Sequence, residues 1–253
     1  MTSRPVLGAG LKMYLSYTQT VSWLGELATR VGAHPAVVSG QVEVFALPGF
    51  TGLESAQNLL GGTKVRWGAQ DVHHEDSGAF TGEVSVVDLA ELGCRYVEVG
   101  HKERITQWGE TPELIAAKTA QVLRHGLVPI ICVGEEQRRS ADDAAAVCLD
   151  QMASYTARAR AEGLSGPIVV AYEPHWAIGA DTPAPAEYVT EVVAGIRSSL
   201  SGFSEVTYLY GGTAGPGVLD EIYPTCDGLF LGRSSHSIDN LVGMVDDALA
   251  LVN

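Results

Sequence analysis

The stretch LVPIICV, residues 127–133, is followed by the Ala-rich stretch 141–162 and then by IVVAYE, residues 168–173. Both short runs are almost continuously apolar and rich in β-branched residues, which is typical of parallel strands covered on both faces. The Ala-rich stretch carries arginines toward its C-terminal end, where cations suit the dipole of a helix. The order of strand, helix and strand predicts one βαβ unit.

The same alternation extends along the whole chain. We expect strands at Val6–Lys12, Val42–Leu47, Val65–Asp71, Tyr96–Gly100, Leu127–Val133, Ile168–Glu173, Val206–Tyr210 and Gly228–Leu231. We expect helices at Thr18–Val31, Thr111–His125, Ala141–Glu162, Pro185–Leu200 and Asp239–Val252. Eight strands alternating with helices over 253 residues favour an α/β fold, a (β/α)8 barrel in one domain spanning residues 1–253. A doubly wound nucleotide-binding fold is disfavoured, because Gly8-Ala9-Gly10 lacks the third glycine of its fingerprint.

Composition excludes several classes of protein. The net charge is −14, from 16 Lys and Arg against 30 Asp and Glu, which argues against nucleic-acid and anionic-membrane surfaces. The four cysteines form no C-x-x-C pair, and no apolar run approaches the roughly 18 residues of a membrane span. We therefore expect a cytoplasmic protein with reduced thiols and with neither a nucleic-acid nor a membrane partner.

Functional side chains of such barrels gather where the strands end. The ends of the expected strands contribute Lys12, His101, Glu173, Gly211, Gly212 and Gly232. A carboxylate can take a carbon-bound proton, an imidazole can polarise an oxygen, and an ammonium group adds positive charge. Backbone N–H groups in glycine turns can hold phosphate. The set predicts proton transfer beside a carbonyl of a phosphorylated substrate, with no metal and no cofactor.

Four motifs then point to a known family. GAFTGE (78–83), GHKER (100–104), AYEPHWAIG (171–179) and YGG (210–212) resemble the motifs of triosephosphate isomerases, in the same order and spacing. The resemblance covers Leu7 to about Leu249 and implies a TIM barrel. It also implies a cofactor-independent isomerase of carbohydrate metabolism that acts on a short-chain sugar phosphate through an enediolate. The first substrate it suggests is dihydroxyacetone phosphate, converted to D-glyceraldehyde 3-phosphate in glycolysis and gluconeogenesis.

The resemblance assigns a role to each matching position. Glu173 matches the base that moves a proton between adjacent carbons, and His101 matches the neutral group that acts on the substrate oxygens. Lys12 matches the substrate-binding lysine, and Glu103 matches the carboxylate that supports the site. The positions expected to hold substrate or phosphate are Gly10, Gly179, Gly211, Gly212, Thr213, Gly232 and Arg233. The positions expected to form a closing lid are Pro174, His175, Trp176, Ala177, Ile178 and Gly179.

Two departures from the family pattern bear on the substrate. Gly10 stands where the family usually has Asn, and Arg233 stands where it usually has a second glycine. A glycine beside Lys12 could admit an extra hydroxymethyl group, and Arg233 could grip phosphate or point outward. A subgroup of the family converts L-erythrulose 1-phosphate to D-erythrulose 4-phosphate, and the run LFLGRS (229–234) looks like that subgroup. Triose phosphate and erythrulose phosphate both stay open as substrates.

The resemblance further implies a homodimer. The loop after the third strand, Val72–Ala79, would insert near the first strand of a partner. We interpret its polar run His73-His74-Glu75 as solvated interface residues rather than as a metal site.

Two functions of other classes compete with an isomerase. One is a Schiff-base aldolase on the same barrel that uses Lys12, although a residue on the first strand suits this role less well. The other is a non-catalytic sugar-phosphate binder. Such a binder would be expected to lose the base, the imidazole or the lid, and the chain retains Glu173, His101 and Trp176.

Overall fold

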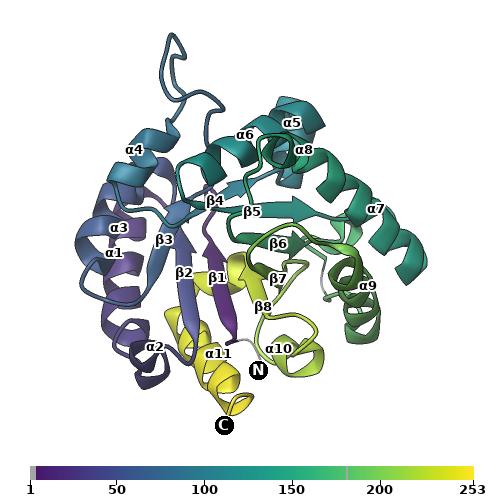
Figure 1. The fold of residues 1–253 in the computed structure, drawn as a ribbon. Coiled ribbons are helices and arrows are strands. Elements are labelled where there is room, and N and C mark those ends of the chain that lie inside the picture. Colours follow the sequence, from purple (N-terminus) through teal and green to yellow (C-terminus); the bar gives the residue numbers. More distant parts are fainter. Residues whose placement is uncertain (1–3, 181) are drawn as a thin grey trace.

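Eight parallel strands close into a barrel in the computed structural model, which describes residues 4–180 and 182–253 (Figure 1). Neighbours in the barrel are neighbours in sequence, and β1 pairs with β8 to complete the ring. The strands are β1 Val6–Gly10, β2 Glu43–Leu47, β3 Arg66–Ala69, β4 Tyr96–Val99, β5 Val128–Val133, β6 Ile168–Tyr172, β7 Val206–Tyr210 and β8 Gly228–Leu231. The expected (β/α)8 barrel is confirmed.

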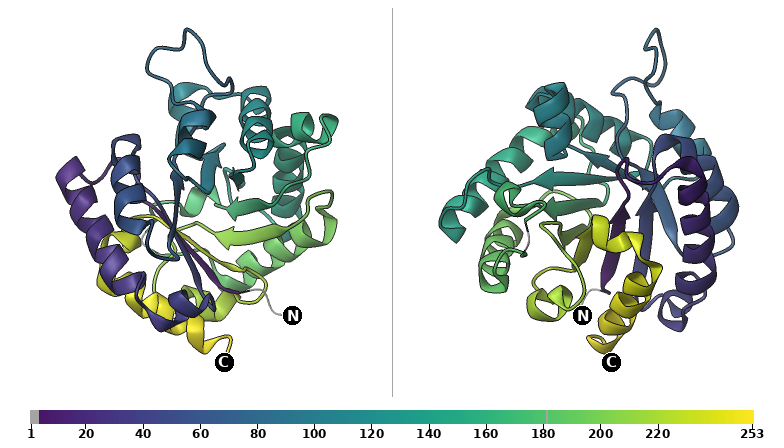
Figure 2. Two further views of the ribbon diagram at one scale, coloured as in Figure 1. Left: turned by 60° about the vertical axis from the view of Figure 1, so that its left-hand side comes forward. Right: turned by 180° about the vertical axis from the view of Figure 1, so that it is seen from behind.

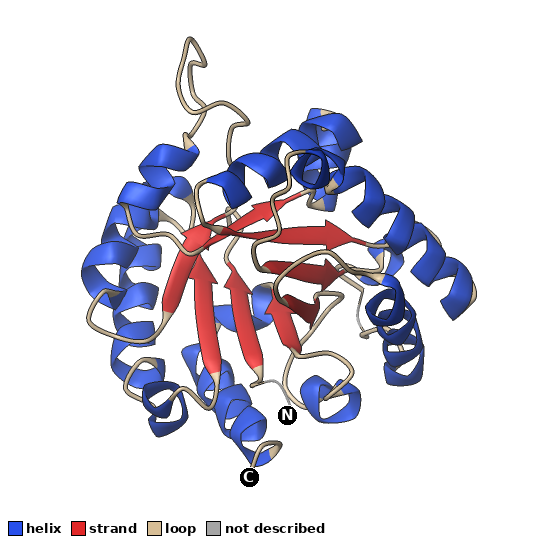
Figure 3. Cartoon of the chain, viewed as in Figure 1, coloured by secondary structure: helices blue, strands red, loops and turns tan. Residues whose placement is uncertain are grey.

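Helices cover the outside of the strands (Figures 2 and 3). They are α1 Tyr17–Glu26, α2 Pro35–Ser39, α3 Leu53–Leu60, α4 Val86–Glu91, α5 Lys102–Trp108, α6 Pro112–Arg124, α7 Ala141–Tyr155, α8 Ala157–Ala161, α9 Ala186–Ser199, α10 Val218–Ile222 and α11 Ile238–Ala250. Short helical turns lie at Leu27–Val31, Phe50–Gly52, His175–Ala177 and Arg233–His236. No helix among residues 4–180 and 182–253 is both long and apolar enough to cross a membrane.

Apolar side chains fill the inside of the barrel. Phe45, Ile130, Leu209 and Phe230 belong to one buried cluster on the inner faces of the strands. Gly8 makes room for it, because a Cβ atom at this position would lie 2.1 Å from the Phe45 ring. A filled interior leaves the ends of the strands as the place where a small molecule can bind.

The expected element bounds differ from the observed ones in two ways. The expected helix 141–162 divides at Thr156, whose hydroxyl donates to the Met152 carbonyl at 2.6 Å and competes with the helical pattern. The first, third, fourth and sixth strands end one or two residues earlier than expected. Lys12, His101 and Glu173 therefore follow their strands, in the segments that lead to the helices.

A long segment between β3 and α4 projects from the barrel (Figure 1). It contains the expected dimer loop Val72–Ala79. His73 in this loop is buried and stacks on Phe80 at 4.1 Å between ring centroids. The expectation that the histidines here are solvated is therefore wrong for His73, because the loop packs its own rings together.

Candidate active site

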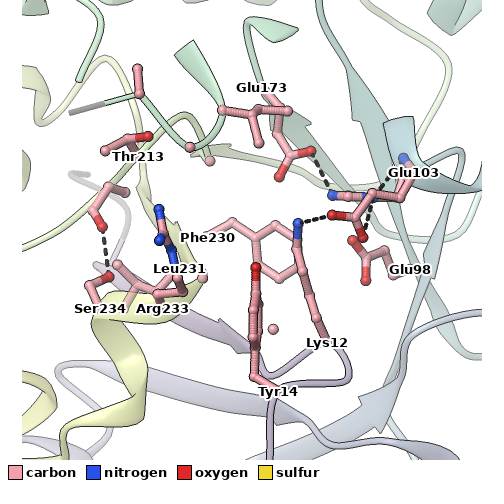
Figure 4. A pocket seen from close by; sticks show the side chains of 18 residues that line it. Lys12, Tyr14, Glu98, Glu103, Glu173, Thr213, Phe230, Leu231, Arg233 and Ser234 are labelled. Carbon is pink, nitrogen blue, oxygen red and sulfur yellow. Dashed lines mark hydrogen bonds and ion pairs between the residues drawn. The ribbon is translucent and has the colours of Figure 1, made fainter. Parts of the chain in front are cut away.

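A cavity of about 620 Å³ lies where the strands end, bordered by segments from both halves of the chain (Figure 4). Of the residues predicted from the sequence, those that line it are Gly10, Lys12, His101, Glu103, Glu173, Ile178, Gly179, Gly211, Thr213, Gly232 and Arg233. The fold thus brings the predicted base, imidazole and ammonium group to one space.

Glu173 follows β6 and is 5% exposed. Gly211 packs directly against it, because a Cβ atom at Gly211 would lie 2.6 Å from Glu173 Oε1. Burial raises the pKa of Glu173 to about 7, with the Lys12 charge opposing and the Glu103 charge adding to the rise. The carboxyl group can therefore accept and release a proton near neutral pH, as a base for repeated proton transfer requires.

His101 is the N-cap of α5, and its Nδ1 accepts the Glu103 backbone N–H at 3.1 Å. An acceptor Nδ1 in a neutral ring leaves the proton on Nε2. Burial, together with the Lys12 charge, lowers the pKa of His101 to about 4, so the ring is neutral at pH 7. Nε2 lies 3.5 Å from Glu173 Oε2, and no hydrogen bond to that oxygen forms within the described residues. An N–H donor and a carboxylate oxygen thus face the same small space.

Lys12 adopts a left-handed backbone conformation, with φ of 48°, which is unfavourable for a residue with a Cβ atom. The Gln70 amide holds this turn by donating to the carbonyls of Lys12 at 3.1 Å and Leu47 at 2.9 Å. Lys12 Nζ donates to Glu103 Oε1 at 2.7 Å. Burial opposes the charged form of Lys12, but the hydrogen bond and charge of Glu103 outweigh it and raise the pKa. Lys12 therefore carries a fixed positive charge into the cavity.

The base of the expected lid is tied to the barrel. Trp176 Nε1 donates to the buried Glu135 carboxylate at 2.7 Å, and Thr213 Oγ1 donates to the Ala177 carbonyl at 2.6 Å. Pro174, His175, Trp176 and Ala177 do not line the cavity, whereas Ile178, Gly179 and Ala180 do. Trp176 packs beside Tyr188, so Ile178 is the apolar lid side chain that can cover a substrate.

The remaining predicted positions differ in how they meet the cavity. A Cβ atom at Gly10 would lie 3.4 Å from Phe230 Cζ, an ordinary van der Waals contact, so a carbon atom fits at this wall without displacing the ring. Arg233 extends toward the cavity in Figure 4, and within the described part of the chain it forms no ion pair. Gly212 does not line the cavity and packs against Pro174 and Tyr210 instead.

Sequence reasoning missed three residues that shape this site. Gln70 fixes the Lys12 turn, Glu135 anchors the lid base, and Glu98 lines the cavity from inside the barrel. For Glu98 a signal existed, because a lone acid within the buried strand YVEV is unusual. For Gln70 and Glu135 the relevant contacts join distant segments, which no local pattern reveals.

A carboxylate that titrates near pH 7 beside an uncharged imidazole can move a proton between adjacent carbons, and this is the chemistry of a sugar-phosphate isomerase. The family model described as triosephosphate isomerase matches residues 5–248. The chain belongs to the triosephosphate isomerase family.

The similar proteins carry two different names. The chain is 44% identical to an L-erythrulose-1-phosphate isomerase of Pectobacterium atrosepticum, covering 99% of this chain and 98% of that protein. It is 40% identical to a triosephosphate isomerase of Mycobacterium bovis, covering 84% of each. It is 38% identical to an L-erythrulose-1-phosphate isomerase of Rhizobium etli, covering 84% of this chain and 82% of that protein. These matches support a sugar-phosphate isomerase and leave two substrates to distinguish.

Proposed function

We propose that this protein interconverts L-erythrulose 1-phosphate and D-erythrulose 4-phosphate. The observation that carries the proposal is the space at Gly10, which has no side chain and where an added carbon atom would fit in van der Waals contact with Phe230, 3.4 Å away. Erythrulose 1-phosphate differs from dihydroxyacetone phosphate by one hydroxymethyl group on the carbon that loses its proton. A wall without a side chain next to Lys12 gives that group a place. The full-length similarity to the Pectobacterium protein supports the same substrate.

The proposed reaction uses only side chains of the cavity. The Glu173 carboxylate takes the proton from C3, and the electrons of that C–H bond form the C2=C3 double bond of an enediolate. The Nε2–H of His101 and the ammonium group of Lys12 stabilise the negative charge that develops on the C2 oxygen. Glu173 returns its proton to C2, the imidazole of His101 gives a proton to the C2 oxygen and takes the proton of the C3 hydroxyl, and a carbonyl forms at C3. The product is D-erythrulose 4-phosphate, numbered from its other end.

We assign the phosphate group to the wall of the cavity formed by the segments that follow β7 and β8. Gly211, Gly232 and Arg233 line this wall, and the glycines bring bare backbone to it. Arg233 adds a guanidinium group that can bind phosphate through paired N–H donors. We assign phosphate binding to these residues and lid closure to the segment from Ile178 onward, which excludes water from the enediolate.

Triose phosphate isomerisation is the second candidate, favoured by the 40% identity to the mycobacterial enzyme. The raised pKa of Lys12, which its bond to Glu103 maintains against burial, disfavours a Schiff-base aldolase, because an imine-forming lysine must be neutral. A non-catalytic binder would have no use for a buried carboxyl group that titrates near pH 7.

The two substrates can be compared directly. We expect kcat/KM for L-erythrulose 1-phosphate to exceed that for dihydroxyacetone phosphate by ~10³-fold, a difference of about 4 kcal/mol in transition-state binding. Proton NMR follows both reactions without coupling enzymes. A preference of the same size for dihydroxyacetone phosphate would favour triose phosphate isomerisation instead. If the protein converts neither substrate, a non-catalytic sugar-phosphate binder is the function that remains.

We also propose that the protein is a cytoplasmic homodimer. The projecting loop 72–79 supports this assembly, as do large apolar side chains near the first strand that a monomer leaves in water: Met13 is 97% exposed and Tyr17 is 59% exposed. Light scattering at micromolar concentration is expected to give about twice the 26.7 kDa chain mass. A measured mass equal to that of a single chain would contradict the dimer.

A further inference from the structure

Glu98 is a carboxyl group inside the barrel that the proposed reaction does not use. It lies on β4, is 7% exposed and lines the same cavity as Lys12 and His101. In Figure 4 its carboxyl group points from β4 toward Lys12. The hydrogen bond it receives comes from the Cys132 thiol at 3.7 Å, a weak donor at a long distance. Within the described residues no Lys, Arg or His forms an ion pair with Glu98.

Burial of such a carboxyl group lowers the stability of the folded protein. A buried carboxyl group without strong partners destabilises a fold, and an apolar residue would pack at the same place without that cost. The inner wall also carries Ile130, the register partner of Glu98 on β5, and Phe230 on β8, which are apolar and fully or nearly fully buried. On the inner wall, Glu98 borders the unfilled space of the cavity. This position therefore suggests that a polar group of the substrate is the missing partner.

The environment also sets the charge of this carboxyl group. Burial, followed by the charge of Glu173, raises the pKa of Glu98 well above its usual value, while Lys12 and the Cys132 thiol partly oppose the rise. Asp71 adds to it. The shift favours the protonated form of Glu98, which carries both an O–H donor and a C=O acceptor. A hydroxyl group can accept a hydrogen bond from this O–H and donate one to this C=O, so it pairs with both groups.

We propose that Glu98 determines specificity by binding the terminal hydroxyl group of a four-carbon substrate, while the space beside Gly10 receives the carbon that bears it. Gly10, Glu98 and Phe230 line one continuous cavity, and the Phe230 ring forms the apolar side of the space at Gly10. A hydroxymethyl group has one apolar and one polar end, and these walls match both. This inference rests on the proposed function and deepens it, because it assigns the residue that distinguishes four carbons from three.

The test combines a substrate change with a residue change. The probe is 4-deoxy-L-erythrulose 1-phosphate, which keeps the fourth carbon and lacks its hydroxyl group. In the wild-type protein we expect kcat/KM for this analogue to be lower by ~10²-fold than for L-erythrulose 1-phosphate, because a buried polar group is left unpaired. In Glu98→Leu we expect kcat/KM for L-erythrulose 1-phosphate to fall by a similar factor. When Glu98→Leu is assayed with the 4-deoxy analogue, we expect kcat/KM to fall no further than it does for the residue change or the substrate change alone.

Three further measurements keep the result interpretable. Glu98→Gln retains a donor and an acceptor and is expected to stay within about tenfold of the wild type on erythrulose 1-phosphate. Cys132→Ala removes the thiol but leaves the carboxyl group, and is expected to change kcat/KM less than threefold. Binding of 2-phosphoglycolate, which has no fourth carbon, is expected to be unchanged in Glu98→Leu and shows that the site is folded.

The outcomes separate the inference from the proposed function. If Glu98→Leu lowers turnover of erythrulose 1-phosphate, its 4-deoxy analogue and dihydroxyacetone phosphate equally, Glu98 acts on Lys12 or Glu173 and the specificity role is overturned. Additive losses for the residue and the hydroxyl group would overturn it as well. If the wild-type protein converts only dihydroxyacetone phosphate, the proposed function fails and the inference fails with it.

Discussion

Glu173→Gln is expected to lower kcat by ~10⁴-fold, which corresponds to about 5 kcal/mol of transition-state stabilisation. Glutamine has nearly the same shape as glutamate and keeps the packing against Gly211, where there is no room for a larger change. It cannot accept a proton from carbon. Binding of 2-phosphoglycolate should change by less than about tenfold, because glutamine keeps the packing against Gly211 and leaves Gly232 and Arg233 unchanged.

The stability of the variant provides a second readout. The pKa of Glu173 is raised from 4.5 to about 7, so the folded protein binds this proton more tightly than the unfolded chain does. Stability is therefore lost as the pH rises through this window, and above it the ionised group costs about 3 kcal/mol. Glutamine avoids that cost, so Tm at pH 8 should equal or exceed that of the wild type. Glu191→Gln, an exposed change on α9, is the matched control. Activity within tenfold of the wild type would refute the role of Glu173.

Lys12→Met is expected to lower kcat/KM by ~10³-fold or more, because the cavity loses its partly buried ammonium group. Methionine preserves most of the length and the apolar stem of the side chain. The change also removes the positive charge that holds down the pKa of Glu173. The pKa of the base should then rise above 7.

The pH profile distinguishes this effect from a simple loss of binding. Activity needs the ionised form of Glu173, so kcat/KM falls as the pH drops below the pKa of that group in the free protein. In Lys12→Met the acidic limb should move to higher pH, while the ionisation of the substrate phosphate is the same in both measurements. Lys64→Met, at an exposed position, is the control. An acidic limb that stays in place or moves to lower pH would contradict the proposed electrostatic coupling.

Strands were easier to locate from the sequence than the short helices were. All eight strands were predicted, since runs such as Ile168–Tyr172 are apolar on both faces and stand apart from their surroundings. Short helices such as α2 and α5 were not, because five to seven residues give too little periodicity. Helix α5 begins at the predicted imidazole, whose ring caps it, so this helix depends on a residue that we interpreted only for its chemistry.

The residues of the site could be predicted from the sequence, whereas the contacts that set their properties could not. Lys12, His101 and Glu173 could be found because each follows a recognisable strand and lies within a family motif. The properties that tune them arise from contacts across the barrel. The pKa of Glu173 depends on Lys12 and Glu103, and the strained turn of Lys12 depends on Gln70. Such contacts join different βα units, and their existence follows only from closure of the sheet.

Pairing of β1 with β8 joins segments from the two ends of the chain. The cavity therefore combines Lys12, which follows β1, with Arg233, which follows β8 and is made long after it. A nascent chain on the ribosome can form its first βα units but has no complete binding site until the last strand emerges. Until β8 has been made, β1 keeps an unpaired edge, a surface on which chaperones can act.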